Sequence, residues 1–180
     1  MTQANWSQDA YIKAYRFAAQ AHQGQTVPGT GLPYLMHLSF VSMEVIAALQ
    51  VEPGRDGDLA VQCALLHDTL EDTPVTYAEV LREFGPRVAD GVLALTKNAD
   101  LPKEHQMGDS LRRIAQQPRE VGMVKLADRV TNLQPPPAYW TAQKIEAYRA
   151  EAEQILAALS VSSPSLAARL KAKIAAYPLN

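Results

Sequence analysis

The sequence predicts an all-α fold, and three observations support this prediction. Apolar residues recur at helical spacing along most of the 180 residues. Clusters of glycine and proline separate the periodic segments. No run alternates with period two for long enough to predict a β-strand. With 47% hydrophobic residues, residues 1–180 suffice for a single domain with a sizeable core.

Capping and breaking residues define the helices of the first half. Ser7 is a typical N-cap, and the helix that follows it should end at Gly24. Residues 24–33 contain three glycines and two prolines and predict a loop. Helices should then cover about 34–49 and 59–71, the second with Asp58 as its cap. Thr73-Pro74 ends that helix, because proline cannot continue one.

Similar signals define the second half. Thr76 and Glu79 form a capping box for a helix that Gly85 ends, and Pro86 suits the first turn of the next, which runs to about Lys97. Helices should follow at about 104–116 and 119–133. Three prolines at 135–137 break the chain, and the last two helices are expected at about 141–159 and 164–176.

The composition excludes several classes of function. A net charge of -2 argues against a nucleic-acid polymer as partner. No stretch approaches the ~18 consecutive apolar residues of a membrane span. The polar N-terminus predicts no signal peptide, and the single cysteine, Cys63, predicts no internal disulfide. We therefore expect a cytoplasmic protein; its oligomeric state does not follow from the sequence.

The segment CALLHDTLEDT, residues 63–73, places four polar groups at the end of an apolar run. In one continuous helix His67 and Glu71 would share a face, as would Asp68 and Asp72, because each pair is four residues apart. Three carboxylates so close together repel one another, and a cation would remove the repulsion. The alternative is a solvated helix end, although acidic groups there oppose the helix macrodipole.

Two more polar residues lie on apolar helical faces. Asp128 lies within MVKLADRVTNL, with Asn132 four residues later on the same face. The alternative for Asp128 is a buried ion pair, for which the adjacent Arg129 is poorly placed. His37 begins a nearly continuous apolar helix, where a hydrogen-bonded core histidine is the alternative.

Considered together, these residues predict a metal site. They supply two imidazoles and two carboxylates from three helices, a donor set that suits a divalent metal with positions left for water. The expected ligands are His37, His67, Asp68 and Asp128. No role is assigned to the other two histidines, His22 and His105.

The motifs resemble a known family of enzymes. PYLMH, ALLHDTLEDT, FGPRVADGVLALT, LPK and VKLADRVTNL occur in the order and spacing of the hydrolase domain of RelA/SpoT proteins. The similarity covers roughly residues 9–160 and is strongest to the stand-alone small alarmone hydrolases. An HD dipeptide alone is weak evidence, whereas HD, ED and LADR-x-x-N together are specific. We expect no synthetase domain, because too few residues remain for one.

The resemblance implies a helical HD-domain fold with a buried metal site between helices and one Mn²⁺ per chain. It implies that the 3′-pyrophosphate is removed from nucleotides such as (p)ppGpp by metal-activated water. The four expected ligands match the metal ligands of the family. Glu71 and Asp72 match its catalytic acidic pair, and Lys103, Asn132 and Tyr148 match residues that contact the nucleotide.

One motif departs from the family pattern. Members that act on (p)ppGpp usually carry an Arg-Lys pair before PY-x-x-H that holds guanine, and here Thr26-Val27 occupy about that position. The expected substrates therefore include the adenine analogues, (p)ppApp. Two other functions remain open: another HD-domain phosphohydrolase, such as a nucleoside 5′-monophosphatase, and a non-catalytic nucleotide-binding module.

Overall fold

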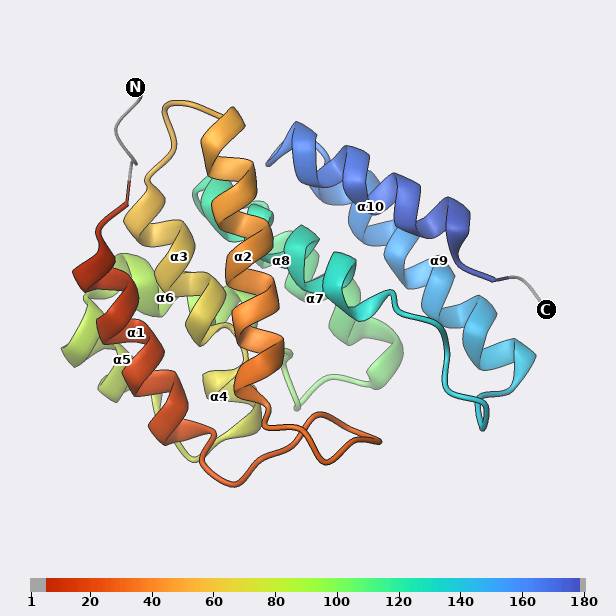
Figure 1. The fold of residues 1–180 in the computed structure, drawn as a ribbon, viewed down its shortest axis with the longest axis horizontal. Helices are drawn as coiled ribbons and strands as arrows, with labels where there is room; N and C mark the ends of the chain where they lie inside the picture. Colours follow the sequence, from red (N-terminus) through yellow and green to blue (C-terminus); the bar gives the residue numbers. More distant parts are fainter. Residues whose placement is uncertain (1–5, 179–180) are drawn as a thin grey trace.

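The computed structural model describes residues 6–178, and helices form its regular structure (Figure 1). Their bounds are α1 Gln8–Ala21, α2 Leu35–Val51, α3 Gly57–Leu66, α4 Thr69–Asp72, α5 Tyr77–Phe84, α6 Pro86–Leu95, α7 Lys103–Ile114, α8 Arg119–Asn132, α9 Ala142–Leu159 and α10 Pro164–Ala176. Within residues 6–178 there is no β-strand, and an isolated bridge joins Thr26 to Pro33. The predicted all-α fold is confirmed.

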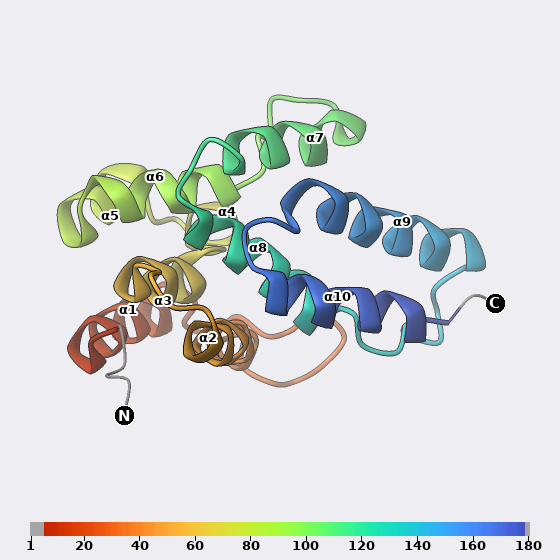
Figure 2. The same cartoon turned by 90° about the horizontal axis from the view of Figure 1, so that it is seen from above.

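Helix α8 lies at the centre of the molecule. It packs against α2, α3, α6, α9 and α10. Figure 2 shows it between α1–α3 on one side and α5–α7 on the other, with α9 and α10 beside it. Nearly all of its residues between Glu120 and Val130 are buried. A polar side chain on this helix therefore needs a partner inside the protein.

The apolar core is continuous across these elements. Fully buried leucines of α2 and α3 meet those of α8 and of the last two helices, among them Leu38, Leu65, Leu126 and Leu170. Helices α2 and α3 carry few polar residues, since both are covered on most sides. No helix of the described chain is long and apolar enough to cross a membrane.

The prediction of one helix over residues 59–71 was wrong, because the helix breaks at His67-Asp68. The ring Nδ1 of His67 donates to the carbonyl oxygen of Ala64 at 2.9 Å. In a continuous helix that carbonyl would accept from the backbone N–H of residue 68. A side-chain bond of this kind competes with the backbone ladder. The chain therefore turns at Asp68 and starts the short helix α4.

The predicted cap of this helix was also wrong. Asp56, and not Asp58, is the N-cap of α3, and its Oδ1 accepts from the backbone N–H of Leu59 at 3.1 Å. Asp58 accepts from the backbone N–H of Ser7 at 2.6 Å and ties the start of α1 to α3. Other predicted signals are confirmed, including the Ser7 cap and the capping box of Thr76.

We predict opposite effects on stability for two glycine-to-alanine substitutions. At Gly122 in α8 a Cβ would lie 2.7 Å from Ser162 Cβ and closer still to its hydroxyl, so Gly122→Ala should destabilise the fold by about 1–3 kcal/mol. Gly108 in α7 is exposed and a Cβ there meets nothing within 4 Å, so Gly108→Ala should stabilise by about 0.5–1 kcal/mol. Thermal unfolding measures both effects. A Gly122→Ala variant with the same unfolding midpoint as the wild type would contradict the close packing at Gly122.

Candidate metal centre and active-site cleft

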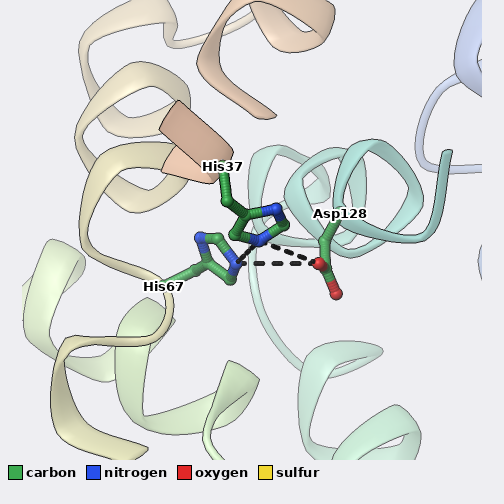
Figure 3. Close-up of side chains that lie close together, drawn as sticks. All are labelled: His37, His67 and Asp128. Carbon is green, nitrogen blue, oxygen red and sulfur yellow. Dashed lines mark hydrogen bonds and ion pairs between the residues drawn. The ribbon is translucent and has the colours of Figure 1, made fainter. Parts of the chain in front are cut away.

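Two imidazoles and a carboxylate meet where three helices converge. His37 lies in the first turn of α2, His67 directly after α3, and Asp128 in α8. The two Nε2 atoms are 3.3 Å apart, and Asp128 Oδ1 lies 3.4 Å from His37 Nε2 and 3.7 Å from His67 Nε2 (Figure 3). All three side chains are buried and offer donor atoms within 4.8 Å of one another, so one ion can contact all three.

Asp68 brings a second carboxylate to the same point. Its Oδ2 lies 2.9 Å from His67 Nε2 and 3.5 Å from His37 Nε2. The four side chains predicted as ligands are therefore close together in the structure. The break after α3 is what turns Asp68 toward the two imidazoles, since Asp68 is the N-cap residue of α4.

The electrostatics of the cluster demand positive charge. Burial lowers the pKa of His67, but the Asp68 and Asp128 carboxylates outweigh burial and raise it to about 10. Burial likewise lowers the pKa of His37, and its hydrogen bonds to the two carboxylates raise it overall. Burial raises the pKa of Asp68, but the two histidines hold it far below its usual range. The two carboxylates therefore favour a positive charge on the imidazoles or on a bound cation.

The residues present fit a divalent metal ion. Because His67 Nδ1 donates to Ala64 O, the neutral ring turns the lone pair of Nε2 toward the cluster. A divalent cation supplies the same charge as two protonated imidazoles. Two nitrogens and two carboxylates suit first-row divalent metals, and Asp68 opens to solvent enough for water to complete the coordination.

Hydrogen bonds fix the orientation of both carboxylates. Asn132 Nδ2 donates to Asp128 Oδ1 at 2.6 Å, and Lys125 Nζ donates to Asp128 Oδ2 at 3.2 Å. Arg129 was expected to be poorly placed for Asp128, and it does not pair with it. It pairs instead with Glu151 at 3.1 Å and lies over the Tyr148 ring. Lys125, on the same helix face as Asp128, helps hold the pKa of that buried carboxyl well below its usual range, against the effect of burial.

Asp68 is held by a residue that the sequence analysis missed. The Tyr34 hydroxyl donates to Asp68 Oδ2 at 2.6 Å. The Tyr34 ring stacks on the buried ring of His22, with centroids 5.0 Å apart, and His22 Nδ1 lies 2.6 Å from Gln25 Oε1. His22, to which we assigned no role from its position in the sequence, thus supports the tyrosine that orients Asp68.

The acidic pair lies beside the cluster, and its two members have different surroundings. Glu71 Oε1 accepts from Lys97 Nζ at 2.8 Å, and Glu71 Oε2 accepts from the Lys97 backbone N–H at 2.9 Å. Within the described chain Asp72 makes no side-chain hydrogen bond or ion pair. Partial burial, then Asp68 and Glu71, raise the pKa of Asp72.

A cavity of about 560 Å³ opens next to these groups. It brings together acidic residues, three lysines and the polar residues of α8. Its walls include Asp68, Glu71, Asp72, Lys97, Lys103, Lys125, Asp128, Asn132 and Tyr148. Lys97 and Lys125 bind Glu71 and Asp128 there, and a cation in the cluster together with the three lysines would favour a ligand with several negative charges.

A second cavity of about 540 Å³ shares Asn132 and Tyr148 with the first. His37 lines it, and most of its other walls are apolar or aromatic: Val27, Pro28, Met36, Phe40, Pro135, Pro136, Pro137, Trp140 and Tyr177. None of the described residues in its walls is arginine or lysine. Such a cavity suits a flat, apolar group.

The structure places the remaining predicted residues as follows. Lys103, at the start of α7, lines the first cavity, and Val27 lines the second. Thr26 lines neither; it pairs with Pro33 across the loop. His105 is exposed, in agreement with its having no assigned role.

Comparisons with known proteins agree with this arrangement. The family model described as HD domain matches residues 14–165. A guanosine-3′,5′-bis(diphosphate) 3′-pyrophosphohydrolase of Aquifex aeolicus is 36% identical over 67% of this chain, which spans 17% of that protein's length. The corresponding MESH1 enzyme of Danio rerio is 31% identical over 89% of both chains.

Solved structures extend the comparison. A metazoan ortholog of SpoT that hydrolyses ppGpp matches 97% of this chain and 99% of its own, with a TM-score of 0.81 and 25% identity. A Listeria monocytogenes structure matches 81% of this chain with a TM-score of 0.61. The chain therefore belongs to the HD-domain family, in the group that contains the MESH1 proteins.

Proposed function

We propose that this chain is a metal-dependent hydrolase that removes the 3′-pyrophosphate from alarmone nucleotides, (p)ppGpp or its adenine analogues (p)ppApp. One observation carries the proposal: His37, His67 and Asp128, with Asp68 against both histidines, lie beside a cavity that also holds an acidic pair and three lysines. The names of the MESH1 relatives and the activity of the metazoan SpoT ortholog support it. The single cysteine is buried and free, which agrees with action in the cytoplasm.

In this proposal His37, His67, Asp68 and Asp128 hold one Mn²⁺ per chain. When bound, the ion lowers the pKa of water and offsets negative charge on the phosphoryl group. Lys103 and Lys125, in the walls of the first cavity, neutralise the pyrophosphate, and Asn132 and Tyr148 contact the nucleotide at the boundary of the two cavities. Glu71 and Asp72 move the proton that the departing ribose oxygen requires.

The metal assignment predicts loss of the ion in ligand variants. The wild type should contain about one Mn²⁺ per chain. His67→Ala and Asp128→Ala remove donor atoms from the cluster, so the purified variants should contain far less metal. Elemental analysis measures this, and circular dichroism confirms folding. His105→Ala is the control, because His105 is exposed and outside the cluster. Full occupancy in both ligand variants would rule out the assignment.

Replacing either member of the acidic pair should lower turnover and leave the bound metal in place. Glu71→Gln and Asp72→Asn leave the four ligands intact, and removing a positioned acid or base should lower kcat by about 10²–10⁴-fold. Glu146→Gln, on the exposed face of α9, is the control.

The measurement is the release of product from ppGpp and ppApp in the presence of Mn²⁺. The wild type should release pyrophosphate. Orthophosphate would indicate a nucleotide phosphatase instead, and binding without product would indicate a binding module. Near wild-type rates in the Glu71→Gln/Asp72→Asn double variant would show that the pair is structural.

We predict that the enzyme handles guanine poorly compared with relatives that carry the Arg-Lys pair, and that (p)ppApp is a substrate at least as good. Arginine can donate two hydrogen bonds to O6 and N7 of guanine, a contact worth about 1–3 kcal/mol, or roughly five- to 150-fold. Val27 cannot donate, and no arginine or lysine lines the second cavity. The comparison is kcat/KM for ppGpp and ppApp with the same metal. Val27→Arg should shift the ratio toward ppGpp; a strong wild-type preference for ppGpp would contradict the idea.

A further inference from the structure

Lys97 distinguishes the two members of the acidic pair. Helix α6 ends at Leu95, and Thr96 leaves the helical conformation. The backbone N–H of Lys97 is therefore free to bind Glu71 Oε2 at 2.9 Å, while its ammonium binds Oε1 of the same carboxylate at 2.8 Å. Both oxygens of Glu71 thus accept hydrogen bonds from one residue that lies 26 positions away in the sequence.

The surroundings of the two carboxyls favour different roles. Because Lys97 donates to both oxygens of Glu71, this carboxyl is fixed in place as a hydrogen-bond acceptor. Asp72 has no such donor within the described chain, and it lies near the carboxylates of Asp68 and Glu71. Partial burial, and after it the carboxylates of Asp68 and Glu71, raise the pKa of Asp72.

We propose that the acidic pair divides its work, with Lys97 as the positioning residue that fixes Glu71 as a hydrogen-bond acceptor and Asp72 as the group that carries the proton. This inference rests on the proposed function. Glu71, fixed at the rim of the first cavity, orients the attacking water as a hydrogen-bond acceptor. Asp72 is the acid for the leaving group.

The reaction balances with one proton moved. The oxygen of water forms a bond to the 3′-linked phosphorus, and the bond from that phosphorus to the ribose 3′ oxygen breaks with its electron pair on oxygen. Asp72 gives its proton to this oxygen, which leaves as a hydroxyl group. The proton lost by water restores Asp72, and pyrophosphate is released.

The alternative role for Lys97 is direct contact with the substrate, because its ammonium lines the first cavity together with Lys103 and Lys125. The two roles differ in what the variant Lys97→Met should change. A phosphate contact would mainly raise KM. A positioning residue that acts through Glu71 would mainly lower kcat, and its loss should have no effect once Glu71 has been replaced.

The test is a pair of double-mutant cycles. Lys97→Met should lower kcat about tenfold in the wild type, less than Glu71→Gln does, because the backbone N–H of Lys97 still binds Glu71. In the Glu71→Gln background the same change should be less than about twofold, whereas in the Asp72→Asn background the tenfold loss should persist. Lys97→Arg, which keeps the charge, should restore most of the activity. Bound metal should remain equal in all variants.

Each outcome decides between the ideas. A tenfold loss in all three backgrounds, or a rise in KM with kcat unchanged, overturns the positioning role of Lys97 and makes it a phosphate ligand. A loss that vanishes in Asp72→Asn but persists in Glu71→Gln reverses the proposed division of work. If the metal-loaded wild type releases no pyrophosphate from any nucleotide, the proposed function itself fails, and the two failures are therefore distinguishable.

Discussion

The arrangement of the structure depends on the close approach of two imidazoles and two carboxylates at one buried point. Left unbalanced, such a cluster would destabilise the fold, because buried charges are costly unless compensated. The charge can be balanced by protons on His37 and His67 or by one divalent ion. Protons and metal therefore compete for the same Nε2 lone pairs, and metal binding must displace the protons that the carboxylates otherwise draw onto the imidazoles. The same carboxylates that destabilise the fold without a cation attract a cation to the site.

This constraint explains the arrangement of the elements around it. The donors come from α2, the α3–α4 junction and α8, so these segments must meet, and α8 at the centre of the molecule contacts both α2 and α3. The carboxylates cannot rotate freely, since Asn132 and Lys125 hold Asp128 and Tyr34 holds Asp68. The interruption of the helix at His67 has two effects on the site. The ring bond to Ala64 aims Nε2 into the cluster, and the turn that follows carries Glu71 to the mouth of the first cavity.

Local signals in the sequence predicted most of the fold, and contacts between distant residues account for what they missed. Ser7, the Thr76 capping box and Pro86 mark helix ends because their chemistry acts within one turn. The cluster of two imidazoles and two carboxylates could be anticipated because polar residues on apolar helical faces stand out. The break at His67 was missed, since it arises from a side-chain bond that propensity does not include. Lys97 and Tyr34 gave no signal, because their partners lie 26 and 34 positions away.

The two cavities suggest how chemistry and base selection are kept apart in this chain. Asp68 and Asp128 line the first cavity and His37 lines the second, so the metal centre lies at their boundary, where Asn132 and Tyr148 belong to both. On the proposed function, the reacting phosphorus occupies this boundary, with its pyrophosphate toward the lysines and the nucleoside toward the apolar wall. Much of that wall comes from the loop before α2 and from the three prolines after α8, and neither segment contains a residue of the metal-binding cluster. Proline has no backbone N–H, so residues 135–137 offer a base no main-chain donors. On the proposed function, the wall that meets the base can therefore change while the four predicted ligands stay the same, so that Val27 can occupy this wall in place of a basic residue.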